Sequence, residues 1–217
     1  MRIMIHAVPK RLEHVNTLRS ILAAQGVHPE EILLYVDENM EGNLEATVKS
    51  YEYLEERILD PEEQIWHLQD DVVICEDFAE RIKIIQEDMP HGIVCAFCSE
   101  VDRGVRPGNV SPALMWYSFQ CIRIPAGLSS GFAMWIRDGD HSEEQAKKIE
   151  ANKFDDSLFM EFMIEQHPFY PVYNCSPNLV DHRDDMCGGS IVNPGREEQI
   201  RALYYTERAS DAWVNRL

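Results

Sequence analysis

The chain has 217 residues and a formal net charge of −18, and hydrophobic residues make up 45% of it. This composition is that of a globular protein and excludes disordered and fibrous chains, while the negative charge disfavours non-specific binding to nucleic acid. Its apolar runs are shorter than the roughly 18 residues of a membrane span, and residues 1–6 are too few and too polar for a signal peptide, so we expect no membrane contact.

Short apolar runs alternate with amphipathic segments through the first half of the chain. They predict strands at 2–8, 32–36, 65–68 and 92–98, and helices at 10–25, 44–58 and 78–88. This alternation is typical of a parallel sheet with helices on its faces. The expected fold is therefore α/β, with a Rossmann-like, mostly parallel central sheet and helices on both sides of it.

The second half of the chain has a less regular pattern. It predicts strands at 114–124, 132–136 and 169–173, helices at 143–151, 156–166 and 197–208, and loops at 101–111, 129–131 and 178–195. The sequence contains no internal repeat, low-complexity tract or linker, so we expect a single domain.

The six cysteines are not accompanied by a secretion signal, which favours free thiols in a reducing compartment and hence a cytoplasmic protein. Cys95 and Cys98 form a CxxC pair inside a predicted strand. Residues three apart on a strand point to opposite faces, so the two thiols could not bind one metal ion together. We expect both to be buried free thiols.

Two adjacent carboxylates, Asp70 and Asp71, directly follow the strand predicted at 65–68. Ligands of an open parallel sheet bind beyond the C-terminal ends of its strands. Two carboxylates placed there repel each other, and Mg²⁺ or Mn²⁺, which take oxygen ligands and share them with phosphates, would relieve the repulsion. A polar turn is the alternative interpretation of the dipeptide on its own.

The order of several short motifs resembles the glycosyltransferases of the GT-A fold, over roughly residues 2–190. The motifs are HAVP at 6–9, LQDDV at 68–72, SSGFA at 129–133, FDDS at 154–157 and PNLVDH at 177–182. The commoner form of the metal-binding motif has an acidic residue where this chain has Gln69. The resemblance implies one GT-A-like domain over 1–217, with a nucleotide-sugar-binding half over about 1–100, an acceptor half over about 101–195 and a tail over 196–217.

The resemblance also implies a role for each matching residue. The donor would be bound by His6, Val8, Asp37, Gln69 and Asp70, the metal by Asp71 and His182, and the acceptor side would be formed by a loop containing Ser130, Gly131 and Phe132. The catalytic base would be Asp156 or its neighbour Asp155. Helix capping is the structural alternative for these two residues, and a surface or core position is the alternative for His182.

The function implied is that of a metal-dependent, hexosyltransferase-like enzyme. It would move a sugar from a nucleotide-diphosphate sugar to an acceptor hydroxyl, with inversion and with Mn²⁺ or Mg²⁺ as cofactor. UDP-sugars are favoured and GDP-sugars are the alternative donor. The acceptor is open between a glycan, a protein and a modified DNA base, and a homo-oligomer is also left open.

Two other functions use the same features. A nucleotidyltransferase would place paired Asp residues at the same sheet edge, but it usually has an early glycine-rich loop for the triphosphate, and residues 8–11 contain no glycine. A non-catalytic GT-A relative would act as a binding module and bind a partner through the aromatic run at 114–119.

Overall fold

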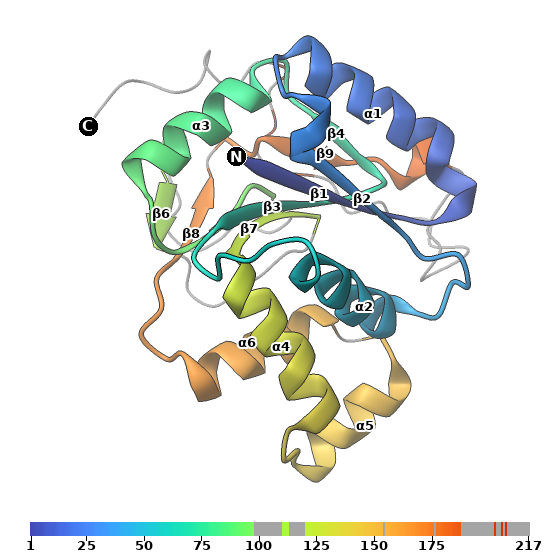
Figure 1. Cartoon of the computed structure of the whole chain (residues 1–217), viewed down its shortest axis with the longest axis vertical. Coiled ribbons are helices and arrows are strands. Elements are labelled where there is room, and N and C mark those ends of the chain that lie inside the picture. Colours follow the sequence, from blue (N-terminus) through green and yellow to red (C-terminus); the bar gives the residue numbers. More distant parts are fainter. Residues whose placement is uncertain are drawn as a thin grey trace.

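The computed structural model of the chain (Figure 1) describes residues 1–97, 110–112, 120–153, 155–175 and 177–187, together with 202, 205 and 207. The second cysteine of the CxxC pair, the aromatic run at 114–119 and most of the loop predicted at 101–111 lie outside the described residues. So does most of the helix predicted at 197–208.

A seven-stranded mixed sheet forms the centre of the molecule. From one edge to the other its strands are β2 (Ile32–Val36), β1 (Arg2–Ala7), β3 (Gln64–Gln69), β7 (Cys121–Pro125), β5 (Ile93–Cys95), β8 (Val172–Cys175) and β6 (Val110–Pro112). Strands β7 and β6 run against their neighbours, whereas β2, β1, β3, β5 and β8 all point the same way. The predicted α/β fold with a mostly parallel central sheet is therefore confirmed.

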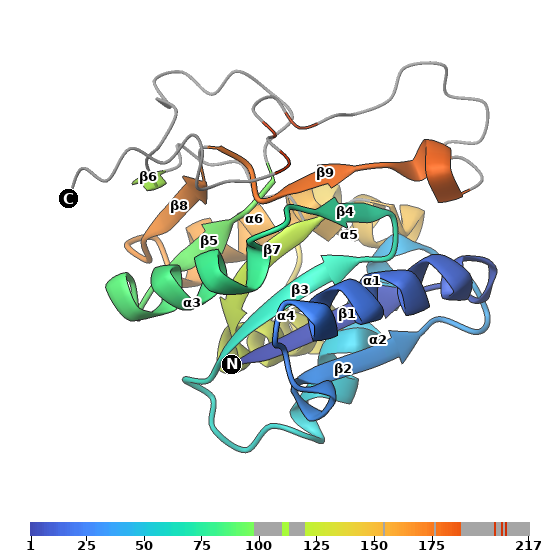
Figure 2. The same ribbon diagram turned by 90° about the horizontal axis from the view of Figure 1, so that it is seen from above.

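Helices cover both faces of this sheet, as Figures 1 and 2 show. The helices on one face are α1 (Leu12–Ala24) and α3 (Phe78–Asp88), and those on the other side are α2 (Asn43–Glu55), α4 (Ala126–Asp138), α5 (Glu143–Ala151) and α6 (Asp155–Gln166). Alternate residues of β1 enter different cores: Ile3 and Ile5 pack with α1 and α3, and Met4 packs with α2 and α4. Burial on both faces explains why β1 is a nearly continuous apolar run, whereas β2, at the edge of the sheet, is only partly buried.

Most predicted elements of the first half have their expected positions. The helix predicted at 10–25 is divided into a 3-10 turn, η1 (Pro9–Arg11), and α1. Helix α3 begins directly after Asp77, as the sequence predicts, but the Asp77 carboxylate accepts from Arg81 Nε at 3.0 Å instead of capping the helix. The strand predicted at 92–98 extends from Ile93 to Cys95.

The cysteines in the described part of the chain are free thiols, as predicted. Cys75, Cys95, Cys121 and Cys175 are buried and Cys187 is partly exposed. The pairing of Cys95 with Ile122 of β7 places this thiol inside the sheet. Burial raises the pKa of Cys175, which keeps it in the neutral form.

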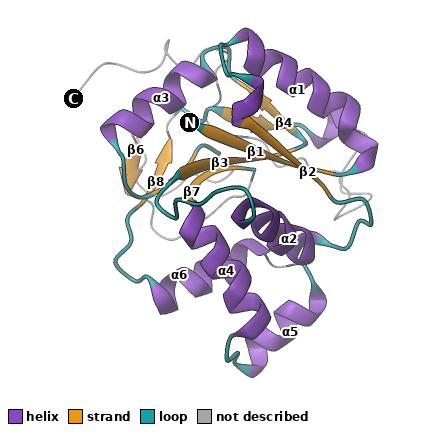
Figure 3. Ribbon diagram, viewed as in Figure 1, coloured by secondary structure: helices purple, strands orange, loops and turns teal. Residues whose placement is uncertain are grey.

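The prediction of a turn at 129–131 and a strand at 132–136 is wrong, because these residues lie inside helix α4 (Figure 3). The helix begins after Pro125. Its buried residues Leu128, Phe132 and Ile136 recur at intervals of four, which is the helical period, whereas Met134 is exposed. Gly131 faces Phe162 of α6. A Cβ atom added to Gly131 would lie 3.5 Å from Phe162 Cζ, which is an ordinary van der Waals distance.

A second, two-stranded sheet pairs β4 (Val72–Ile74) with β9 (Val180–His182) in antiparallel fashion, as Figure 2 shows. The prediction of a continuous loop at 178–195 is therefore wrong over β9 and over the following 3-10 turn, η3 (Asp184–Cys187). Strand β9 is too short to show an alternating pattern, and two of its three residues are polar. Its register places His182 opposite Val72.

The late strand lies at Val172–Cys175, a few residues beyond its predicted position at 169–173. No helix in the described ranges is both long enough and apolar enough to cross a membrane.

A pair of substitutions on α4 tests whether this segment is a helix. Phe132 is 0% exposed and its ring contacts those of Phe159 and Phe162, so Phe132→Ala should lower the free energy of unfolding by about 3–5 kcal/mol. Met134 is 64% exposed, so Met134→Ala should change it by less than about 0.5 kcal/mol. Urea unfolding measures both values. Because a strand would bury residues 132 and 134 on one face, equal losses would contradict the helix.

Candidate functional site

The candidate site lies where β1, β2 and β3 end. Val8 follows β1, Asp37 follows β2, and Asp70 and Asp71 follow β3. The three strands are parallel, with His6 of β1 opposite both Tyr35 of β2 and Gln69 of β3. Their C-terminal ends therefore meet at one edge of the sheet, which is the place where open α/β sheets bind ligands.

The two aspartates are joined by the guanidinium of Arg11. Arg11 Nη1 donates to Asp70 Oδ1 at 2.7 Å and to Asp71 Oδ2 at 2.6 Å. The other oxygen of Asp70, Oδ2, accepts from the backbone N–H of Val8 at 2.8 Å. All three side chains are buried, so the bridge is shielded from water and the opposite charges attract strongly.

Strand β9 brings a histidine to the same pair. His182 Nε2 lies 3.1 Å from Asp71 Oδ2, and the backbone N–H of Arg183 donates to the carbonyl of Asp71 at 2.7 Å. Burial alone would raise the pKa of Asp71, but hydrogen bonds and positive charge from His182 and Arg11 outweigh it and hold the pKa below its usual value. For Asp70, burial outweighs the attraction of Arg11, and its pKa is raised.

The carboxylate oxygens leave little room for a divalent cation in this arrangement. Both oxygens of Asp70 and Oδ2 of Asp71 already take part in the contacts above, whereas Asp71 Oδ1 is buried without a hydrogen-bond partner among the described residues. Nor do the described ranges contain three or more His, Cys, Asp or Glu side chains placed to hold a metal ion. The arrangement does not fit a metal, and ligation by Asp71 and His182 stays a prediction.

Sequence reasoning missed Arg11. Its side chain is 5% exposed, and a buried arginine is nearly always paired. Arg11 ends the turn η1, which follows β1 directly. A signal was present in the sequence: a cation placed four residues after a parallel strand lies at the same sheet edge as the residues that follow the neighbouring strand.

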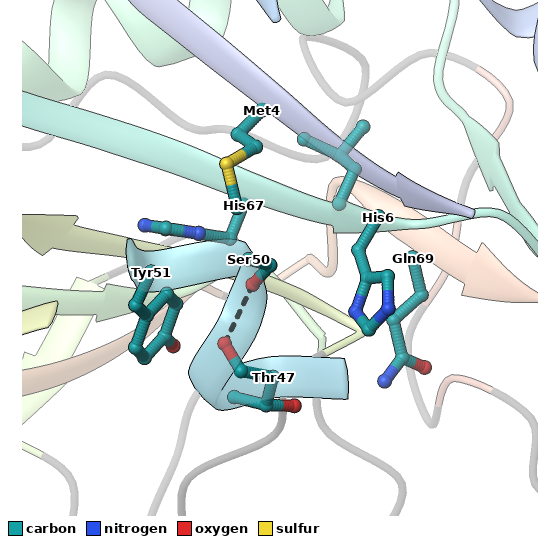
Figure 4. Close-up of a pocket in the computed structure, with 8 residues that line it drawn as sticks. Met4, His6, Thr47, Ser50, Tyr51, His67 and Gln69 are labelled. Atoms are coloured by element: carbon teal, nitrogen blue, oxygen red, sulfur yellow. Dashed lines mark hydrogen bonds between the residues drawn. The ribbon is translucent and has the colours of Figure 1, made fainter. Parts of the chain in front are cut away.

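A small pocket, lined mostly by residues with polar side chains, lies on the α2 face of the same strands (Figure 4). His6 and Gln69 lie at one end of it, and Tyr51 and His67 lie at the other, with Ser50 between them. Its volume of about 20 Å³ holds a water molecule and is far too small for a nucleotide base. Burial lowers the pKa of His6 to about 4 and that of His67 to about 3, so both rings are neutral at physiological pH.

The two acidic residues at the start of α6 differ in environment. Asp155 is buried, and its Oδ2 accepts from Thr47 Oγ1 of α2 at 2.9 Å. Burial, followed by the negative charge of Asp156, raises the pKa of Asp155 to about 7. Asp156 is exposed and its Oδ1 accepts from the backbone N–H of Ser157 at 2.7 Å. Of the two, Asp156 is therefore the carboxylate that an incoming molecule can reach.

The structure thus divides the predicted site residues into groups. Val8, Asp70, Asp71 and His182 are brought together around Arg11. His6 and Gln69 line the pocket on the α2 face together with Thr47, whose hydroxyl donates to Asp155.

The remaining predicted residues have contacts that also stabilise the fold. Asp37 closes the turn after β2, because its Oδ2 accepts from the N–H of Glu41 at 2.9 Å. Ser130, Gly131 and Phe132 belong to helix α4. The prediction that they form an acceptor-side loop is therefore wrong, and the buried ring of Phe132 cannot contact an acceptor.

The sequence matches no protein-family model and no curated protein. Among solved structures, S. aureus TarS 1–349 aligns with 81% of this chain and 60% of its own length, at a TM-score of 0.49 and 11% identity. A second TarS structure aligns with 81% of this chain and 35% of its own length, at a TM-score of 0.49 and 12% identity. The chain thus spans less than two thirds of either structure.

The raised pKa of Asp155 predicts a specific pH dependence of stability. Its pKa rises from 3.8 in the unfolded chain to about 7 in the folded one, so the folded state binds the extra proton between these values. Stability should therefore fall as pH rises from about 4 to 7, by up to about 4 kcal/mol for this group.

Asp155→Asn should remove this contribution, because the amide stays neutral and can still accept from Thr47. The measurement is the urea midpoint of both proteins between pH 4 and 8, with Asp140→Asn as an exposed control. The urea midpoint of the control should change with pH as that of the wild type does. The midpoint of Asp155→Asn should rise relative to both as pH rises. Parallel curves for all three proteins would refute the buried, protonated Asp155.

Proposed function

We propose that this chain is a glycosyltransferase that moves a sugar from a nucleotide-diphosphate sugar to an acceptor hydroxyl, with inversion. The observation that carries the proposal is the buried aspartate pair after β3, which two other segments, the turn after β1 and strand β9, hold in place. Those segments supply Arg11, the N–H of Val8, and His182. Buried adjacent carboxylates are costly to a fold, so their presence at the ligand-binding edge of a sheet is best explained by chemistry.

The donor would lie across the ends of β1, β2 and β3. His6 and Gln69 lie beside each other on the α2 face, and Asp37 stands at the end of β2, so these side chains would contact the base and ribose. Val8 and Asp70 are joined by a hydrogen bond at the ends of β1 and β3, and Asp70 would orient hydroxyl groups of the donor's ribose or sugar. A uridine donor is favoured, with a guanosine donor as the alternative.

The acceptor would be activated by a carboxylate of α6. The acceptor oxygen attacks the anomeric carbon while the bond from that carbon to the diphosphate oxygen breaks, and the bonding electron pair leaves with the nucleoside diphosphate. The hydroxyl proton passes to the carboxylate of Asp156, which is exposed and able to meet an acceptor. Asp155 acts behind it, because its bond to Thr47 fixes the first turn of α6 against α2.

A nucleotidyltransferase is the second candidate for the same sheet edge. The turn after β1 contains Pro9, Lys10 and Arg11 as a 3-10 turn and no glycine. Triphosphates are usually cradled by a glycine-rich loop whose backbone N–H groups approach the phosphates closely. The absence of glycine from this turn therefore favours sugar transfer.

A panel of nucleotides distinguishes these functions. We expect UDP, at about a hundredfold excess over its Kd, to raise the melting temperature by a few degrees. GDP would do so if the donor is a guanosine sugar, and ATP should have no effect. The measurement is a thermal shift with UDP, GDP, CDP and ATP, each with and without Mn²⁺. A shift with ATP alone would favour nucleotidyl transfer, and the absence of any shift would contradict the donor site.

The role of the exposed carboxylate can be tested by turnover. Asp156→Asn should lower kcat for UDP-sugar consumption by about 10²–10⁴-fold and leave the nucleotide-induced thermal shift unchanged, because it removes a base and not a donor contact. Asp140→Asn is the matched control, since Asp140 is also exposed but lies between α4 and α5. Equal activity in Asp156→Asn and the control would exclude Asp156 as the base.

A further inference from the structure

We propose that Arg11 is the resident cation of the Asp70–Asp71 pair, so that the free protein does not take a divalent metal ion there. The Arg11 bridge and sugar transfer are independent of each other. Arg11 can be the resident cation in a chain that transfers no sugar, and a chain that transfers a sugar can bind a metal ion at the pair.

The contacts show that the guanidinium uses the oxygens a metal would need. Nη1 of Arg11 lies 2.7 Å from Asp70 Oδ1 and 2.6 Å from Asp71 Oδ2, so one nitrogen joins the two carboxylates. Val8 N–H occupies Asp70 Oδ2, and His182 Nε2 shares Asp71 Oδ2. Only one carboxylate oxygen of the pair, Asp71 Oδ1, has no partner among the described residues.

Burial makes the guanidinium and a metal ion mutually exclusive. The side chains of Arg11, Asp70 and Asp71 are 5%, 7% and 9% exposed, so water screens their charges poorly. A divalent cation bound between the carboxylates would add two positive charges beside a buried guanidinium. Like charges that close repel strongly in a medium of low polarity, and one of the two cations must therefore leave.

The position of Arg11 in the fold supports the same conclusion. It ends η1, a 3-10 turn between β1 and α1, and the adjacent backbone N–H of Val8 binds the same aspartate. The turn thus delivers a fixed positive charge and a hydrogen-bond donor to the end of β3. Two buried carboxylates need such compensation, and here the chain itself supplies it.

The test compares Mn²⁺ binding by the wild type, Arg11→Gln and Lys10→Gln. Arg11→Gln removes the resident cation, whereas Lys10→Gln removes the same charge from the neighbouring exposed position. The nucleotide-free proteins are titrated with MnCl₂, and bound metal is followed by electron paramagnetic resonance. Melting curves are recorded in EDTA and in Mn²⁺.

We expect Arg11→Gln to bind Mn²⁺ at least about tenfold more tightly than the wild type and the Lys10→Gln control. In EDTA this variant should melt below the wild type, and Mn²⁺ should raise its melting temperature by several degrees while leaving the other two unchanged. If Arg11→Gln does not fold in EDTA, recovery of the folded state on addition of Mn²⁺ is the same expected result.

Equal Mn²⁺ affinity in the wild type and Arg11→Gln would overturn the proposal, whether both bind tightly or neither binds. An Arg11→Gln variant that Mn²⁺ neither stabilises nor refolds would also overturn the proposal. So would a Lys10→Gln variant whose Mn²⁺ affinity rises as much as that of Arg11→Gln. None of these outcomes bears on nucleotide binding by the wild type, which the nucleotide panel measures separately.

Discussion

The buried bridge from Arg11 to Asp70 and Asp71 is the interaction on which the candidate site depends. Two adjacent carboxylates removed from water would destabilise the fold without a cation and hydrogen-bond donors. The chain supplies them from the turn after β1, and the small sheet formed by β4 and β9 adds His182 from the other side. The ends of β1, β3 and β9 are thereby held together.

An ion-paired group and a group of neutral histidines lie at this edge of the sheet. The aspartate pair is charged and ion-paired, whereas the pocket on the α2 face is lined by histidines whose pKa values burial has lowered. His6 belongs to the pocket and still feels the negative charge of Asp71. The arrangement suits a donor whose diphosphate and nucleoside lie along one edge, with the exposed carboxylate of Asp156 left for the acceptor.

The sequence predicts those features of the fold that have a periodic signal. Buried strands such as Arg2–Ala7 and amphipathic helices such as Phe78–Asp88 are found close to their predicted positions because burial imposes the pattern directly. Helix α4 was predicted wrongly, since its Ser-Ser-Gly segment has the composition of a turn and tertiary packing against α6 decides its structure. Strand β9 has two polar residues and no pattern at all.

The site was predictable in part for the same reason. Asp70 and Asp71 stand out because two adjacent carboxylates repel each other, and their position at the strand end follows from the fold. Arg11 was missed despite its place after a strand, because an isolated arginine in a sequence is usually solvated and its burial depends on partners that are 59 and 60 residues away. Asp155 likewise differs from Asp156 through its burial and its hydrogen bond to Thr47 of α2, neither of which can be seen in the sequence.

Hydrogen exchange of the protein with and without bound UDP is the most direct test of the central claim, that a nucleotide-sugar donor binds where β1, β2 and β3 end. The account predicts that UDP slows exchange in peptides covering the turn after β1, the end of β2 and the Asp70–Asp71 segment. Protection confined to other parts of the chain, or none in the presence of saturating UDP, would contradict it.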